Sequence, residues 1–160
     1  MNASITCLLG ALAITVVGLP TTVDAAAPAG HYVVTAGSGT GNGTVYDTKS
    51  KLTWQQTVSS TTYYWADAKT YCAGVGTSHG GTGWRLPTIK ELQSIVDYSQ
   101  TANPLIDPIA FPSTPRSGFW SSSQSASSSS YAWSVHFGNG GSGNYDVSKV
   151  SNFAYARCVR

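Results

Sequence analysis

The chain has 160 residues, of which only 10% are charged, and its formal net charge at pH 7 is +2. Its lysines and arginines are scattered rather than clustered, which excludes the basic patch typical of nucleic-acid binding. The length provides for one domain with its own core, and we expect no second domain.

The first 25 residues have the pattern of a signal peptide. An apolar run from Ile5 to Leu19 has about the length of a signal-peptide core and is short for a membrane span. Val23 and Ala25 have the small side chains that signal peptidase accepts, which predicts cleavage after Ala25 although no lysine or arginine precedes the run. The alternative is an uncleaved anchor helix. After cleavage we expect no membrane span and a secreted, cell-surface or periplasmic location.

Cysteine usage predicts one disulfide. Cys7 lies in the predicted signal peptide, so Cys72 and Cys158 remain as a pair in a chain sent to an oxidising compartment. A bond between them would stabilise the fold by roughly 4 kcal/mol. A redox or metal pair is the alternative, but CxxC spacing and accompanying histidines are both absent.

The first half of the mature chain predicts a loose segment, a hairpin and two helices. Residues 26–44 are rich in glycine and are expected to be flexible, and the main domain is expected to cover residues 45–160 with a short hairpin at its start. Apolar residues at helical spacing predict a helix over residues 64–75, which turns Cys72 toward the core. Pro87, followed by Thr88 and Glu91, forms the capping-box pattern of a second helix start.

The second half of the mature chain predicts loops and antiparallel strands. Prolines punctuate an irregular stretch after Tyr98, and a strand is expected at residues 119–121. The serine-rich run 121–130 is interpreted as a surface loop. Residues 131–137 alternate as a strand with Trp133 on its inner face, so Trp133, like Trp120, is expected to lie in the core. Residues 138–143 predict a glycine-rich hairpin loop, and residues 153–159 predict a last strand with Cys158 on its buried side.

Several ordered motifs are similar to those of one protein family. They are Val45-Tyr46-Asp47 with Leu52-Thr53-Trp54-Gln55, Trp65-Ala66-Asp67-Ala68 with Tyr71-Cys72, Gly83-Trp84-Arg85-Leu86-Pro87-Thr88 with Glu91-Leu92, Phe119-Trp120-Ser121-Ser122, and Arg157-Cys158-Val159-Arg160. Together they resemble the Lcl C-terminal domain family, named for the end domain of a bacterial collagen-like adhesin. The resemblance covers residues 45–160, but the collagen-like Gly-X-Y repeat is absent, so trimerisation through such a stalk is not implied.

The resemblance implies an α+β, C-type-lectin-like fold. In that fold two helices pack on a small antiparallel sheet with long irregular loops, here with one disulfide. It also implies a surface-binding role, and a relation in fold to the formylglycine-generating enzymes, which share the Arg85-Leu86-Pro87-Thr88 string. Those oxidases hold copper with a close pair of cysteines near the C-terminus, where this chain has only Cys158. We therefore expect no enzyme activity, with such an oxidase as the disfavoured alternative.

Residues that look catalytic are interpreted as structural. Trp84, Arg85 and Glu91 are expected to fix a loop onto the second helix through a buried ion pair, and a catalytic role is the alternative. His31, His79 and His136 are far apart in the sequence, and no hydrolase or phosphate-binding motif is present. We expect no cofactor; calcium is the alternative, but neither an EF-hand spacing nor a lectin calcium-binding sequence supports it.

The last third of the chain contains the aromatic, amide and carboxylate groups that sugar binding uses. Loops on a rigid scaffold usually carry function. The predicted ligand-binding residues are Asn139, Asn144, Tyr145, Asp146 and Asn152. We expect an adhesion or ligand-binding module for a glycan or a surface protein, which could also form a homo-oligomer. A self-assembling surface or fibre protein is the alternative of a different class.

Overall fold

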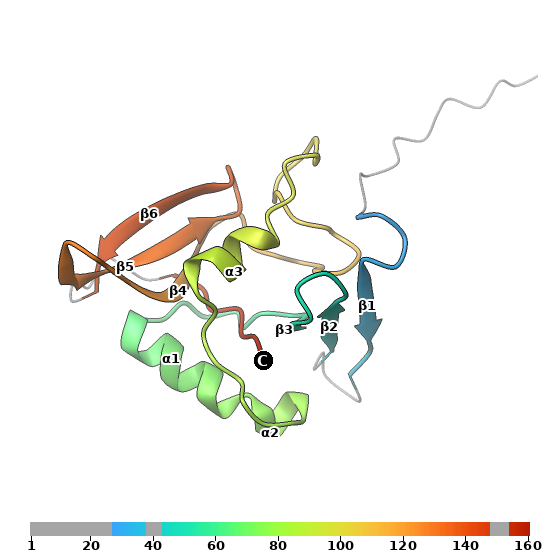
Figure 1. Ribbon diagram of the computed structural model, residues 1–160, viewed down its shortest axis with the longest axis horizontal. Coiled ribbons are helices and arrows are strands. Elements are labelled where there is room, and N and C mark those ends of the chain that lie inside the picture. Colours follow the sequence, from blue (N-terminus) through green and yellow to red (C-terminus); the bar gives the residue numbers. More distant parts are fainter. Residues whose placement is uncertain (1–26, 38–42, 148–153) are drawn as a thin grey trace, which may run out of the picture.

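The computed structural model describes residues 27–37, 43–147 and 154–160 (Figure 1). These residues form two three-stranded antiparallel sheets, helices on the connecting segments, and one disulfide. The α+β class and the disulfide expected from the sequence are thus confirmed. The expectation of one small sheet is wrong, because the described strands divide into two sheets. Besides the two expected helices, a short third helix lies at residues 76–79. The predicted signal peptide lies outside the described residues.

The first sheet has the strand order β1-β2-β3, with β1 at Tyr32–Thr35, β2 at Thr44–Asp47 and β3 at Thr53–Gln55. The predicted hairpin is confirmed as β2 and β3. Its turn is held by Asp47, whose carboxylate accepts hydrogen bonds from the backbone N–H of Lys49 at 2.8 Å and from the Ser50 hydroxyl at 2.6 Å. β1 lies within residues 26–44, which were expected to be flexible. Its β-branched side chains favour an extended strand that pairs with β2, despite the glycines that follow in the sequence.

Three helices follow: α1 at Trp65–Gly74, α2 at Gly76–His79 and α3 at Ile89–Ser94. α1 buries Trp65, Ala68 and Cys72, as its apolar spacing predicts. α3 begins with the predicted capping box, in which Thr88 and Glu91 bond each other's backbone N–H groups. The short α2 has no buried residue and gave no apolar pattern in the sequence.

The second sheet has the order β4-β5-β6, with β4 at Gly118–Ser125, β5 at Ser128–His136 and β6 at Gly141–Asp146. β4 and β5 run through the serine-rich segment, so its interpretation as a surface loop is wrong. The serines fit a sheet because their hydroxyls are satisfied there: Ser121 is fully buried and its Oγ donates to the carbonyl of Trp133 at 2.8 Å.

An irregular pairing between β4 and β5 changes which side chains of β5 are buried. The register shifts between Trp120 and Gln124. Ala132 and Ser134, expected to face outward, are buried, whereas Trp133 is only partly buried. The prediction of a core position is therefore confirmed for Trp120, which is 1% exposed, and wrong for Trp133.

The C-terminal segment, residues 154–160, threads between the two sheets. It forms isolated bridges rather than the continuous strand expected from its alternation, because it pairs in turn with different elements. Tyr155 pairs with β4, and Val159 pairs with both Trp54 of β3 and Arg85. Cys158 is fully buried as predicted, and its bond to Cys72 links this segment to α1.

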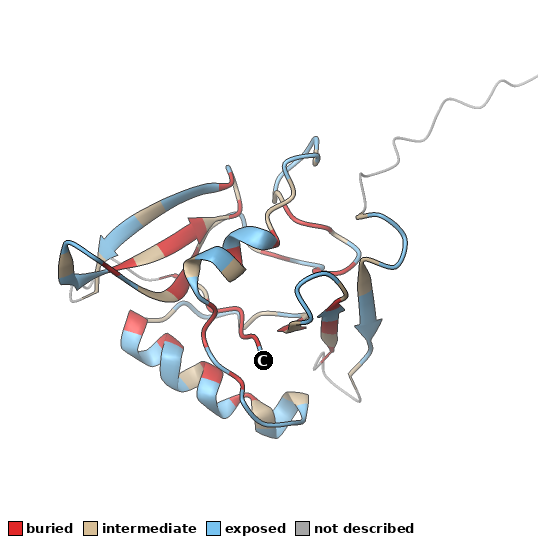
Figure 2. Cartoon of the chain, in the orientation of Figure 1, coloured by how far each residue is buried: buried red, intermediate tan, exposed pale blue. Residues whose placement is uncertain are grey.

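Two apolar clusters form the core. One packs α3 against β4 and β5 around Phe119, and the other contains the disulfide and Trp120. Arg157 lies fully buried beside them and donates to the carbonyls of Gln55 and Gln56 at 2.8 and 2.6 Å. No helix among the described residues has the length and apolar character to cross a membrane. The outer strands β1 and β6 are largely exposed, as are the outward sides of α1 and α3 (Figure 2).

Candidate functional site

The β5–β6 hairpin carries a group of aromatic and polar side chains on one face. Tyr131 lies directly opposite Asp146, and Trp133 lies directly opposite Asn144. Directly paired residues of an antiparallel sheet project from the same face, as do alternate residues of one strand. These four side chains therefore share one face, which we call the distal face.

The distal face is accessible to solvent. Tyr131 is 37% exposed, and Trp133 is partly buried. Further along the same face the sheet is covered, because Val135 is fully buried and Gln93 of α3 donates a hydrogen bond to the hydroxyl of Ser142 at 2.8 Å. The two aromatic rings thus lie beyond the part of the sheet that α3 covers.

Polar groups lie beside the two rings. Asn144 is exposed, and its Nδ2 donates to the Ser125 hydroxyl at 3.4 Å, which joins β6 to the end of β4. Asp146 adds a carboxylate opposite Tyr131. Ser125 was not predicted to take part, because the serine-rich run containing it was interpreted as a loop.

The other predicted ligand-binding residues lie elsewhere. The Oδ1 of Asn139 accepts a hydrogen bond from the Gly141 N–H at 2.9 Å and so closes the β5–β6 turn. Tyr145 projects from the opposite face, where its ring meets that of Trp120 nearly at right angles with a centroid distance of 6.4 Å. Asn152 lies outside the described residues. The structure therefore brings Asn144 and Asp146 together and places Asn139 and Tyr145 apart from them.

The residues predicted to fix a loop onto the second helix form a surface ion pair. Arg85 bonds both carboxylate oxygens of Glu91, at 2.7 and 2.8 Å. These bonds, together with those from Thr88, outweigh partial burial and lower the pKa of Glu91 to about 2. The Arg85 side chain is 46% exposed and that of Glu91 22%, so the predicted burial of the pair is wrong.

Trp84 has a packing role. It is 5% exposed, and its Nε1 donates to the carbonyl of Gly80 at 2.8 Å. The guanidinium of Arg160 lies over its ring, 5.4 Å from the centroid. The indole thus holds the loop after α2 against the end of the chain.

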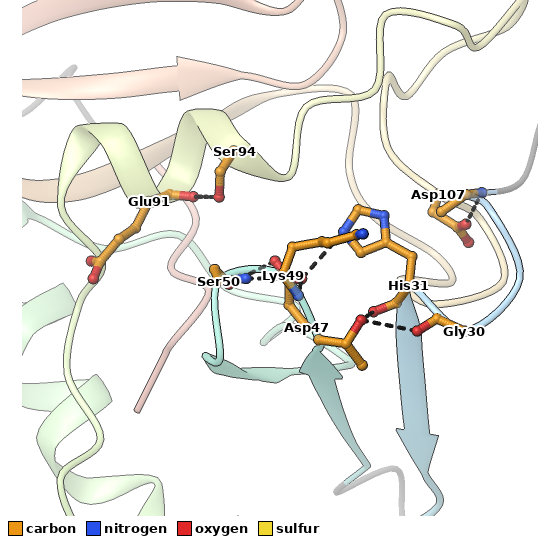
Figure 3. A network of polar contacts seen from close by, with 10 residues as sticks. Gly30, His31, Asp47, Lys49, Ser50, Glu91, Ser94 and Asp107 are labelled. Atoms are coloured by element: carbon orange, nitrogen blue, oxygen red, sulfur yellow. Dashed lines mark hydrogen bonds and ion pairs between the residues drawn. The ribbon is translucent and has the colours of Figure 1, made fainter.

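A second candidate is a cavity of about 190 Å³ whose lining includes His31, Tyr32, Asp97 and Asp107. Figure 3 shows His31 and Asp107 among the polar contacts of this region. Its carboxylates serve the local backbone: Asp107 accepts from the N–H groups of Ile109, Ala110 and Ala27. Asp97 bonds Ser99 in the same way. These bonds fix the loops around the cavity, which gives both carboxylates a structural role.

Asp47, the last residue of β2, contacts His31, which lines this cavity. Burial acts to raise its pKa, but hydrogen bonds from Ser50 and Lys49, and the nearby His31, hold the pKa below the ordinary value. His31 Nε2 lies 3.2 Å from its carboxylate. The pair connects the start of β1 to the β2–β3 turn (Figure 3).

Metal-binding groups are sparse in the described part of the chain. No cluster of three or more His, Cys, Asp or Glu side chains there is placed to hold a metal ion. The sulfurs of Cys72 and Cys158 are bonded to each other, so neither is a thiolate ligand.

These features define a small disulfide-bonded α+β domain with a group of aromatic and polar side chains on one face of its outer hairpin. The family profile described as the Lcl C-terminal domain matches residues 43–160, and the chain belongs to that family. The resemblance expected from the sequence motifs is thus confirmed, and the family indicates an extracellular or surface module. No curated protein matches the chain.

Proposed function

We propose that this protein is a non-catalytic binding module outside the cytoplasm, and that its distal face binds a glycan. One observation carries the proposal. Tyr131 and Trp133 lie side by side on an accessible face, with Asn144 and Asp146 directly opposite them. A surface protein that presents similar groups is the alternative partner.

The chemistry of the distal face suits a sugar. The C–H-rich faces of a pyranose ring pack on aromatic rings, and the ring hydroxyls need donors and acceptors nearby. Tyr131 and Trp133 provide the rings, while the Asn144 amide offers donors and an acceptor, and the Asp146 carboxylate offers acceptors. Partial exposure of two aromatic side chains on one face also favours a binding role, because such rings are enriched in interfaces.

The scaffold holds these groups in place before a ligand arrives. All four side chains lie on strands that pair continuously from Tyr131 to His136 with β6. Groups on strands are held more precisely than groups on loops, and preorganisation reduces the entropy lost on binding. The distal face therefore favours recognition of a preformed sugar surface.

The disulfide and the family support a location outside the cytoplasm. A buried structural disulfide is typical of proteins in oxidising compartments, in agreement with the predicted signal peptide. We also propose that the fold is C-type-lectin-like, as the family resemblance implies. Because the sequence has no calcium-binding motif, binding is expected to be independent of calcium, and we propose no cofactor and no oxidase activity.

A glycan array, run with calcium and with a chelator, tests the proposal. We expect selective binding in both conditions. Tyr131→Ala should weaken it about tenfold, because the variant removes one stacking ring. Tyr145→Ala is the matched control, since this tyrosine lies on the same hairpin but on the opposite face and should leave binding unchanged. Absence of binding by an oxidised, folded sample would exclude the glycan, and loss in Tyr145→Ala alone would move the site to the other face.

A further inference from the structure

The strand β1 leaves one edge of the first sheet without a partner in the described part of the chain. The sheet order is β1-β2-β3, so β1 is an outer strand, and it lies at the periphery of the molecule (Figure 1). It precedes residues 43–160, the part of the chain that matches the family.

The pairing of β1 with β2 shows which backbone groups are available. The N–H of Thr48 bonds the carbonyl of His31, and hydrogen-bonded pairs alternate along an antiparallel ladder. The N–H and C=O groups of Tyr32 and Val34 therefore point away from β2. Among the described residues these four groups form no hydrogen bond. They form a template for another extended strand.

The side chains at this edge are apolar and accessible. Val33 is 50% exposed, and Tyr46, its direct neighbour on β2, is 37% exposed. On the other face Val34 is 42% exposed and lines a shallow groove with Ile109, which is 69% exposed. Natural sheet edges are commonly protected by lysine, proline or a bulge, and β1 has none of these.

We propose that β1 pairs with β1 of a second copy of this chain to form a twofold-symmetric dimer. Antiparallel pairing of Tyr32 with the partner's Val34, and of Val34 with the partner's Tyr32, would satisfy the unpaired groups of both copies with four hydrogen bonds. Val33 then faces its own copy across the twofold axis, and the exposed Tyr46 and Val33 of each copy form one apolar stripe. No like charges oppose each other, because all residues of β1 are uncharged.

The geometry makes this pair a closed dimer rather than a fibre. An isologous interface uses the same edge of both copies, so pairing leaves no second β1 edge to propagate. The strand has only four residues, so the dimer is expected to be weak, and the dimeric fraction is expected to rise with protein concentration. This proposal does not depend on the function of the distal face.

Sedimentation of the oxidised protein over a range of concentrations measures the dimer, and two kinds of variant test its geometry. Val34→Pro removes an N–H that points away from β2, so β1 should stay paired within its own chain. The dimer loses two of its four hydrogen bonds and should weaken about thirtyfold. With oxidised glutathione as the oxidant, Val33→Cys should form an intermolecular disulfide, because the two Cβ atoms of such a directly opposed pair lie within about 5.5 Å.

Thr35→Cys is the matched control for the cross-link. Thr35 is also exposed, but in this register its two copies are separated by four residue steps, or about 13 Å. We expect at least tenfold more covalent dimer from Val33→Cys than from Thr35→Cys, with unchanged melting temperatures. Equal cross-linking by both variants, an unchanged dimer in Val34→Pro, or a monomer at every concentration would each overturn the proposal.

Discussion

Replacing both Cys72 and Cys158 with alanine removes the covalent link between α1 and the C-terminal segment. The bond closes a loop with a sequence separation of 86 residues. The chain-entropy relation gives a stabilisation of about 4.6 kcal/mol for a loop of this length at 25 °C. Both cysteines are 0% exposed, so the missing sulfurs add a cavity cost of about 1 kcal/mol or more. Such a loss is a large part of the typical stability of a domain, about 5–15 kcal/mol.

Urea unfolding of three samples separates these contributions. They are the oxidised protein, the same protein reduced under denaturing conditions and refolded with reductant, and the double alanine variant. The reduced protein keeps its sulfur atoms, so its loss of unfolding free energy measures the cross-link alone. We expect about 4–5 kcal/mol for that loss and a further loss in the alanine variant. A difference below about 1 kcal/mol between oxidised and reduced protein would refute the reasoning.

Three other changes test separate parts of the fold, each by denaturant unfolding. Arg157→Lys should lower the free energy of unfolding by about 3 kcal/mol. One ammonium group cannot replace the guanidinium contacts to Gln55, Gln56 and Thr114. An unchanged free energy of unfolding would contradict this role of Arg157. Glu91→Gln should lower it by about 1 kcal/mol at pH 7, after allowance for solvent screening of the exposed pair. Because the folded-state pKa of Glu91 is lowered to about 2, this contribution is present above its ordinary pKa and is lost as pH falls toward 2, so a difference independent of pH would contradict the ion pair. Gly140→Ala should lower the free energy of unfolding by about 1–2 kcal/mol, because Gly140 has φ +72° and the added methyl group would meet the ring of Tyr98. An unchanged free energy of unfolding would contradict the need for glycine at this turn.

The features predicted correctly depend on local signals or on compartment chemistry. The capping box at Thr88 and Glu91 placed the start of α3 at the observed residue. The spacing of Trp65, Ala68 and Cys72 identified α1 and its buried face. The disulfide followed from the number of cysteines left after the predicted signal peptide, without knowledge of the fold.

The features missed depend on contacts between distant residues. Serine has no strong strand preference, so the serine-rich parts of β4 and β5 gave the pattern of a loop. The hydrogen bond from Ser121 on β4 to the carbonyl of Trp133 on β5 depends on the folded sheet. The burial of Trp133 could not be judged from alternation, because the irregular pairing of β4 with β5 disrupts that pattern.

Arg157 illustrates the same limit in the core. A charged residue in an alternating segment is expected to face solvent, yet Arg157 is fully buried. Two of its acceptors, the carbonyls of Gln55 and Gln56, lie about a hundred residues earlier in the chain. A local sequence pattern cannot predict a hydrogen-bond partner that is so distant in the chain. The distal face depends in the same way on the register of β5 with β6, which brings Trp133 opposite Asn144.

The most direct test of the proposed binding face is a nitrogen–proton correlation spectrum recorded while the array-selected glycan is added. The indole N–H of Trp133 and the side-chain amide of Asn144 should shift together as the ligand binds. The indole signals of the buried Trp84 and Trp120 should stay in place. Shifts confined to Tyr145 and its neighbours, or to the cavity around His31 and Asp107, would contradict the assignment of function to the distal face.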